Sequence, residues 1–132
     1  MKNLLAALCA AALLAACAHG KTAVFPAAAD PANAAQVYVI RNNNLFGWGL
    51  SVTVTLNGAA IAHLQAGEHI ALRLPPGLYS VGITESSTSA AFEKGRHYYF
   101  LVSADYTPTG FEIESIAAGR GEEWLSKTKL LQ

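Results

Sequence analysis

Apolar and polar residues alternate with a period of two along most of the chain after residue 36, as they do in half-buried β-strands. The clearest case is the segment 51–56. There Val52, Val54 and Leu56 are expected to face a core, and the three hydroxyl residues between them to face solvent. Similar patterns predict strands at 37–40, 59–64, 69–74, 78–84, 90–93 and 111–114. The nearly continuous apolar run 97–102 predicts a central strand that is covered on both faces.

Turn residues separate these strands at intervals of about 8–12 residues, which is typical of an all-β domain. Asn57-Gly58 supplies the two positive-φ positions of a tight hairpin, and Pro75-Pro76-Gly77 ends one strand and turns the chain. A four-residue loop, 65–68, could close a second hairpin, and 85–89 reads as a polar loop. We therefore expect an all-β fold: an antiparallel β-sandwich or small barrel, prealbumin-like or immunoglobulin-like.

The tail 122–131 is the one helix predicted after the N-terminal segment. Two acidic residues open it and lysines close it, as the helix dipole prefers, and Glu123 and Lys127 are spaced to form an ion pair. Trp124, Thr128 and Leu131 would share one face. We expect this short C-terminal helix to lie over an open end of the sheets.

The N-terminal segment has a different pattern. A positive charge at Lys2 precedes an unbroken apolar run, and small residues close the run just before Cys17. The run is shorter than the roughly 20 residues that a membrane-spanning helix needs, and it fits the core of a secretory signal. We therefore expect residues 1–16 to be a signal peptide.

The four residues Leu14, Ala15, Ala16 and Cys17 resemble the lipobox of bacterial lipoproteins. The resemblance implies that signal peptidase recognises the first three and that lipid is attached to Cys17. A lipid anchor would then hold the protein in a membrane of the bacterial cell envelope. By resemblance to the sorting of enterobacterial lipoproteins, Ala18 in the next position implies the periplasmic face of the outer membrane. Cys9 would leave with the signal, so the exported domain has no cysteine pair for a disulfide.

Composition supports a small exported domain. Residues 17–35 are rich in alanine, contain two prolines and lack apolar periodicity, so we expect a flexible tether of at most about 60 Å before a single domain at 36–132. Removing Lys2 with the signal leaves 8 basic against 9 acidic residues, a net charge of −1. The chain contains no basic block, and we expect no binding to nucleic acid.

Three segments, in this order, resemble one bacterial family. The first is Val37-Tyr38-Val39-Ile40-Arg41, followed by a glycine-containing loop and the Asn57-Gly58 hairpin. The others are 75–81 and 93–99. Together they are similar to the family called domain of unknown function 2846, over about residues 35–117. The resemblance implies a small β-rich envelope lipoprotein with no assigned activity, and it supplies no catalytic residues.

Side chains that could do chemistry are few. The chain has no nucleophile elbow and no glycine-rich phosphate loop, so we expect neither an enzyme nor a cofactor. His63 and His69 would face opposite sides of a sheet if the 65–68 loop closes a hairpin, so we expect no metal site; a loop one residue shorter or longer would bring the rings together. Glu112 and Glu114 share one face of a strand, where a solvated pair is the expected reading and paired catalytic carboxylates the alternative.

The segment 41–50 is the candidate contact patch. Arg41, Leu45, Phe46 and Trp48 lie in or beside a loop with two glycines, and an exposed apolar group of this kind often marks a docking surface. The alternative is that the loop folds its apolar side chains onto an end of the sandwich.

Taken together, the sequence favours a lipid-anchored, non-catalytic binding or structural module of the envelope, with an envelope protein as a possible partner. A small-ligand carrier is one alternative. A carboxylate-based envelope hydrolase is another, and it requires a cleft that joins Glu112 or Glu114 to a histidine.

Overall fold

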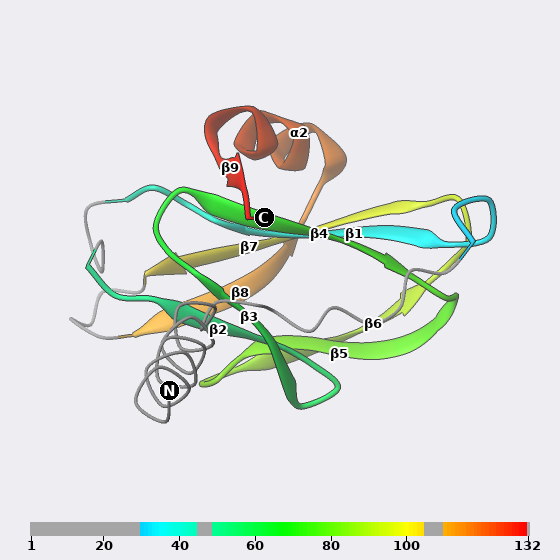
Figure 1. Ribbon diagram of the computed structural model, residues 1–132, viewed down its shortest axis with the longest axis horizontal. Coiled ribbons are helices and arrows are strands. Elements are labelled where there is room, and N and C mark those ends of the chain that lie inside the picture. The colour runs from blue at the N-terminus through cyan, green and yellow to red at the C-terminus, as the bar shows by residue number, and fades with distance from the viewer. Residues whose placement is uncertain (1–29, 45–48, 105–109, 132) are drawn as a thin grey trace, which may run out of the picture.

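The computed structural model describes residues 30–44, 49–104 and 110–131, and Figure 1 shows their arrangement. Within these residues the chain forms strands and one helix. Their bounds are β1 Ala35–Arg41, β2 Val52–Leu56, β3 Ala59–Leu64, β4 Glu68–Leu74, β5 Gly77–Ile83, β6 Ser87–Phe92, β7 His97–Ala104, β8 Phe111–Ile116, α2 Ala118–Lys127 and β9 Lys129–Leu130.

The strands form two sheets that face each other, with α2 lying on the outer side of one of them (Figure 1). The order in the five-stranded sheet is β8-β7-β1-β4-β9, and in the four-stranded sheet it is β3-β2-β5-β6. The predicted all-β sandwich is confirmed, and it is not a closed barrel. It is not purely antiparallel, however, because β1 pairs in parallel with β7, and β4 with β9.

The core lies between the sheets and is made by the inward positions of the alternating strands. Val52, Val54 and Leu56 are buried there, as the alternation predicts. The predicted hairpin after them is also confirmed, since Asn57 and Gly58 have φ values of 50° and 82°. β7 is central, with β1 on one side and β8 on the other, and its residues Tyr99–Val102 are all buried. The domain begins slightly before residue 36, because Ala34 and Ala35 are already buried.

The hairpin predicted around 65–68 is wrong. β3 lies at the edge of the four-stranded sheet and β4 lies in the five-stranded sheet, so this connection crosses from one layer to the other. Gly67 turns the chain with φ 79°, and its N–H donates to the Asn42 carbonyl over 3.2 Å. Leu64 and Ile70 both point into the core, one from each sheet. Alternation alone does not distinguish such a crossover from a hairpin, because both keep the apolar residues inside.

The predicted polar loop at 85–89 is shorter than expected, because β6 begins at Ser87. Gly82 permits the tight turn. A Cβ on this residue would lie 2.7 Å from the Ser86 carbonyl oxygen and 2.7 Å from the Ser87 Cβ, so only glycine lets the hairpin close this tightly. The N–H of Ile83 donates to the Ser86 carbonyl over 2.8 Å. The expected edge strand is present, and it starts three residues earlier than the pattern indicated.

The C-terminal helix exists, but its predicted limits and position are wrong. α2 starts at residue 118, has no acidic residue in its first turn and ends at Lys127; beyond it the chain adds the short strand β9 beside β4. The helix covers the outer face of the five-stranded sheet instead of an open end (Figure 1). Of the three residues expected to share a face, Trp124 packs on this outer face, while Thr128 ends the helix and Leu131 packs against the inter-sheet core.

Apolar residues on the outer face of the five-stranded sheet explain where the helix lies. They form a second cluster with the helix residues Trp124 and Leu125. Its buried strand members are Ile40, Tyr99, Leu101 and Ile116. Left uncovered, this cluster would expose apolar area that costs roughly 25 cal/mol per Å². The predicted ion pair on the helix is confirmed, with Lys127 Nζ 2.9 Å from Glu123 Oε1, and it lowers the pKa of Glu123.

Gly121 sets how closely the helix approaches the sheet. It is the buried residue of α2, and a Cβ added to it would overlap the Tyr99 ring. We predict that Gly121→Ala lowers the free energy of unfolding by about 1–3 kcal/mol, as overpacking does. Urea unfolding followed by circular dichroism would measure this.

Gly119→Ala is the matched control, because it lies in the same helix and an added Cβ meets nothing within 4 Å. Alanine there should stabilise by up to about 1 kcal/mol through helix propensity. Equal effects of the two substitutions would contradict the role given to the Gly121–Tyr99 contact.

Candidate functional site

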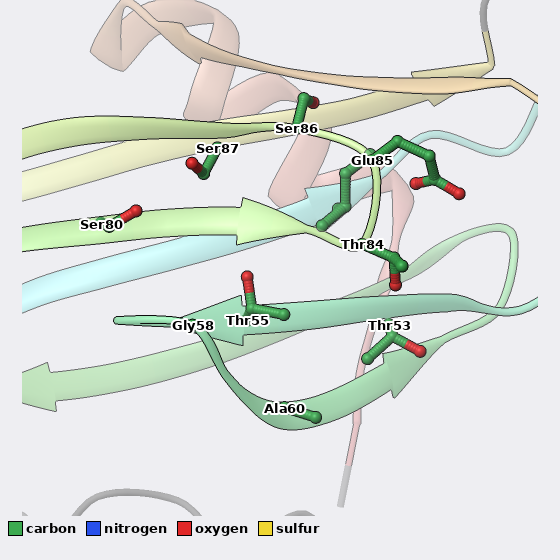
Figure 2. Close-up of a pocket in the computed structure, with 10 residues that line it drawn as sticks. Thr53, Thr55, Gly58, Ala60, Ser80, Thr84, Glu85, Ser86 and Ser87 are labelled. Atoms are coloured by element: carbon green, nitrogen blue, oxygen red, sulfur yellow. The ribbon is translucent and has the colours of Figure 1, made fainter.

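A hollow of about 470 Å³ lies on the outer face of the four-stranded sheet, opposite the core (Figure 2). We call it the hydroxyl hollow, because most of its lining side chains carry a hydroxyl group. Its lining residues are Thr53, Thr55, Gly58, Ala60, Ser80, Ile83, Thr84, Glu85, Ser86 and Ser87. A volume of this size is in the usual range of about 300–1,000 Å³ for small-molecule sites.

Strand alternation places these side chains together. Because the inward positions of β2 and β5 are apolar, the positions between them face outward: Thr53 and Thr55 on β2, and Ser80 on β5. β2 and β5 are neighbours, with Thr55 opposite Gly82. Small side chains and glycine on the outer face leave the hollow between the strands, and the turn at 84–86 forms one wall (Figure 2).

The hydroxyl hollow contains little charge. No lysine or arginine lines it, and its one ionisable lining residue is Glu85, which is exposed. Each serine or threonine hydroxyl donates one hydrogen bond and accepts up to two. The hollow can therefore satisfy a neutral ligand that both donates and accepts, and it offers no cation to an anionic one.

His63 lies beside the hollow on β3, directly opposite Thr53, and its Nδ1 is 3.0 Å from the Thr53 hydroxyl oxygen. A hydroxyl next to an imidazole resembles a nucleophile with its base, but such a pair also needs a group that orients the imidazole. Within residues 30–44, 49–104 and 110–131, no carboxylate forms an ion pair with His63. The contact is an exposed cross-strand pair.

A second, smaller hollow of about 170 Å³ lies at the end of the five-stranded sheet where the chain enters the domain. We call it the arginine hollow, after Arg73 and Arg96 in its lining. Register places Gln36 of β1 between Arg73 of β4 and His97 of β7, so these three residues form a row across the sheet. The side-chain amide of Gln36 donates to the Leu72 carbonyl over 3.2 Å.

Tyr38 occupies the next row, between this hollow and the helix. Its ring stacks on Tyr99 with centroids 5.2 Å apart, and it lies 6.2 Å from the His97 ring. The Tyr99 hydroxyl donates to Glu122 Oε1 of α2. Burial, that hydrogen bond and the nearby negative charge together raise the pKa of Tyr99 to about 12. Burial, with Glu122 again, also raises the pKa of Tyr38.

Several predicted site residues lie outside the described residues. These are the lipid-attachment residue Cys17, the peptidase-recognition residues Leu14, Ala15 and Ala16, and the patch residues Leu45, Phe46 and Trp48.

Arg41 is the described member of the predicted contact patch, and it is buried, with 1 % of its surface exposed. Its guanidinium donates to the Leu50 carbonyl and, over 2.8 Å, to the Leu64 carbonyl, and it lies 4.8 Å from the centre of the Phe111 ring. Burial lowers the pKa of Arg41, and Glu68 partly opposes this. The side chain therefore connects β1 to Leu50 and to the end of β3 instead of lining an exposed patch.

The rings of His63 and His69 do not converge. The reason is not a hairpin within one sheet, as predicted, because their strands lie in different sheets. His63 is on the outer face of the four-stranded sheet and His69 is on the outer face of the other sheet. Nδ1 of His69 lies 2.8 Å from the Thr128 hydroxyl oxygen. Because that hydroxyl donates its own proton to the Trp124 carbonyl, it accepts a hydrogen bond from Nδ1–H of His69. Burial lowers the pKa of His69. The described residues contain no group of three or more His, Cys, Asp or Glu placed to hold a metal.

Glu112 and Glu114 are both exposed on β8, so they do share a face. Glu114 lies 3.8 Å from Arg120 of the helix. The register puts Glu114 in the same row as His69, but β1 and β7 lie between their strands. At about 4.8 Å per strand, the two residues are roughly 14 Å apart. No described hollow joins these glutamates to a histidine.

Neither hollow was predicted from the sequence. The outward positions of Thr53 and Thr55 were predicted, but the sequence does not show that β5 lies beside β2 and brings Ser80 to the same face. The arginine hollow combines residues from β1, β4 and β7, and its row depends on the parallel β1–β7 pair. A run of small outward-facing residues on two strands was the signal available for the first hollow.

The fold and these surfaces define a mixed β-sandwich with a hydroxyl-lined outer face. No family model matches the chain, and no curated protein matches it. Among solved structures, the chain is similar to the N-terminal domain of AlgF from P. aeruginosa, with 15% identity and a TM-score of 0.42. The similarity covers 67% of this chain and 100% of that one. This is a distant likeness, from which neither family nor function follows. In the part of the chain that the structure describes, no helix is both long and apolar enough to cross a bilayer.

The raised pKa of Tyr99 gives a pH prediction. An unfolded tyrosine ionises near pH 10 and folded Tyr99 near 12, so Tyr99 contributes stability below pH 10 that is lost as the pH rises from 10 to 12. Absorbance titration at the tyrosinate band should show one late-ionising tyrosine, and urea unfolding at pH 9 and pH 11 should show the loss.

Tyr99→Phe should remove both the late titration and this part of the pH dependence. Tyr79→Phe is the matched control, because Tyr79 lies in the other sheet and its hydroxyl donates to the Pro75 carbonyl. A late titration that persists in Tyr99→Phe would contradict the assignment.

Proposed function

We propose that this protein is a lipid-anchored, non-catalytic binding module of a bacterial cell envelope, and that the hydroxyl hollow is its binding site. The observation that carries the proposal is the hollow itself: a site of about 470 Å³ lined with six serine and threonine residues and with no cationic side chain. Its ligand class is a neutral, hydroxyl-bearing molecule such as a glycan strand.

Hydrogen-bond chemistry supports this ligand class. A sugar hydroxyl both donates and accepts, and so does each serine and threonine of the lining. Thr55 on β2 and Ser80 on β5 face the same space from neighbouring strands, so one ligand can contact both (Figure 2). These residues lie on rigid strands, which lowers the entropy cost of fixing the contact groups.

The pattern around Cys17 supports the anchor. The apolar run, the Leu14-Ala15-Ala16 stretch and the cysteine are arranged as in a lipobox, and the sandwich begins at Ala35, eighteen residues after the cysteine. One acyl chain binds a membrane weakly, whereas two or more hold a protein stably. The proposed location is the periplasmic face of the outer membrane, and the resemblance to the domain of unknown function 2846 family is part of the same proposal.

A small-ligand carrier is the second candidate, and the volume of the hydroxyl hollow favours it. A carrier would bind a free monosaccharide or similar small molecule as tightly as a polymer, whereas a module that holds the envelope would prefer the polymer. Glu112 and Glu114 line neither hollow, and the arginine hollow that contains His97 does not reach them, so the hydrolase alternative has no comparable support.

The anchor makes one prediction. Cys17→Ser should abolish incorporation of radiolabelled palmitate and move most of the protein from the membrane pellet to the soluble fraction, because the lipid supplies about 0.8 kcal/mol per buried CH₂. Cys9→Ser is the matched control and should leave both measurements unchanged. Sedimentation of Cys17→Ser with membranes at the level of the unaltered protein would refute the anchor.

The hydroxyl hollow generates a second prediction, about ligand binding. We predict that Thr55→Val combined with Ser80→Ala weakens binding to isolated peptidoglycan sacculi about tenfold in a sedimentation assay, since each lost hydrogen bond contributes about 0.5–1.5 kcal/mol. Competition with a monosaccharide distinguishes the carrier from the glycan-binding module.

The matched control is Thr88→Val combined with Ser115→Ala, which also removes one threonine and one serine hydroxyl, but at positions outside the hollow. It should bind sacculi as the unaltered protein does. Binding that is absent in all three proteins, or equally weakened by both double variants, would count against the proposal.

A further inference from the structure

The arginine hollow is a cationic site that the proposed function does not use. Arg73 comes from β4, and the adjacent residues Arg96 and His97 come from the end of the preceding turn and the start of β7, so two separate parts of the backbone bring nitrogen donors to one hollow of about 170 Å³. Gln36 lies between Arg73 and His97 in the register. Guanidinium groups match the geometry of phosphate oxygens and can bind them through two parallel hydrogen bonds.

The acidic groups nearby leave this charge largely available. Arg96 is paired with Glu93 at 2.7 Å, but both side chains are more than 60 % exposed, and such surface pairs contribute only about 0–1 kcal/mol. The carboxylate of Asp30 accepts hydrogen bonds from the Ala32 N–H over 3.2 Å and from the Asn33 amide over 3.1 Å, so it is directed at its own turn.

Arg73 is exposed, and it forms no ion pair with any carboxylate of the described residues. Lys94 follows Glu93 in the same exposed turn and adds another positive charge. The hollow therefore offers two guanidinium groups to an anion, one of which is not engaged by an acid.

The position of the hollow relative to the chain indicates where its ligand comes from. Pro31 and Ala34, at the start of the domain, line the hollow, and the Gly95 N–H donates to the Ala34 carbonyl over 3.0 Å. The chain therefore enters the domain beside the turn between β6 and β7 (Figure 1). Thirteen residues lead from Cys17 to Asp30 and span at most about 45 Å, so a membrane that holds Cys17 is within reach of the hollow.

We propose that the arginine hollow binds the phosphate group of an anionic lipid headgroup in the membrane that holds Cys17. The inference rests on the anchor of the proposed function but not on the hydroxyl hollow. The lipid phosphate lies between the two guanidinium groups, with Arg73 as the principal donor. Headgroup binding adds a second contact to the acyl anchor and fixes the strand end that contains residues 31–36 against the membrane surface.

Vesicle flotation tests the proposal with residues 17–132 carrying Cys17→Ser, so that neither the expected signal peptide nor an acyl chain contributes. Vesicles contain either phosphatidylcholine alone or equal parts of phosphatidylcholine and phosphatidylglycerol. We expect tighter binding to the anionic vesicles, and we expect Arg73→Gln to weaken that binding about tenfold, because a charge-assisted hydrogen bond is lost.

Arg120→Gln is the matched control, because it removes the same charge from an exposed arginine on α2, outside the arginine hollow. It should weaken binding less than twofold. Equal losses in the two variants would show a general attraction between charges, and would overturn the site. Equal binding to neutral and anionic vesicles would overturn the lipid ligand.

Titration with inorganic phosphate, followed by amide chemical shifts, distinguishes a lipid phosphate from a free phosphate as the ligand of the arginine hollow. Shifts centred on Gly95, Arg96 and His97, together with tight binding to the anionic vesicles, support a lipid phosphate. The same shifts without any preference for anionic vesicles would assign the hollow to a free phosphate and refute the proposal. Because the tested chain has no acylated cysteine, a failure here is distinct from a failure of the Cys17 anchor, which palmitate labelling measures.

Discussion

The parallel pairing of β1 with β7 is the contact on which the rest of the structure depends. These two strands form the middle of the five-stranded sheet, and both are buried on the side that faces the other sheet. Their outer side is apolar too, at Ile40, Tyr99 and Leu101, so it needs a cover of its own. The chain supplies one with α2, whose Gly121 lies directly against Tyr99. The domain is thus three layers deep at its centre, and both candidate sites lie on parts of the outer faces that the helix does not cover.

The sequence predicts most of the strands because one side of each faces a core and the other faces solvent. Val52, Val54 and Leu56 illustrate this, since a one-residue shift would expose all three. Prediction failed where two arrangements bury the same residues. At residues 65–68 a hairpin and a crossover both keep Leu64 and Ile70 inside, and the difference lies in which sheet each strand joins. The predicted start of α2 was wrong for another reason. Gly119 and Gly121 are weak helix formers, and the packing of Gly121 against Tyr99 outweighs that preference.

The candidate sites were harder to predict than the strands, because each depends on strand neighbours that are distant in sequence. Arg73, Gln36 and His97 become one row only when β4 and β7 lie on either side of β1. The outward direction of Thr55 follows from alternation, but Ser80 lies on the same face nearby only because β2 pairs with β5. Arg41 shows the opposite case. Its place beside a loop suggested exposure, yet the guanidinium is buried and donates to the carbonyl groups of Leu50 and Leu64.

The two hollows differ in chemistry and lie in different sheets, so one ligand does not fit both. The arginine hollow belongs to the five-stranded sheet, at the end where the chain enters, and its lining includes two guanidinium groups. The hydroxyl hollow is on the outer face of the four-stranded sheet, on the far side of the inter-sheet core, and its lining contains hydroxyl groups and no cation. Since the core separates the two hollows, the proposed membrane headgroup in the first would leave the second free for the proposed neutral ligand. A sandwich is well suited to this division, because strand alternation makes its two outer faces chemically independent while both remain fixed to one rigid core.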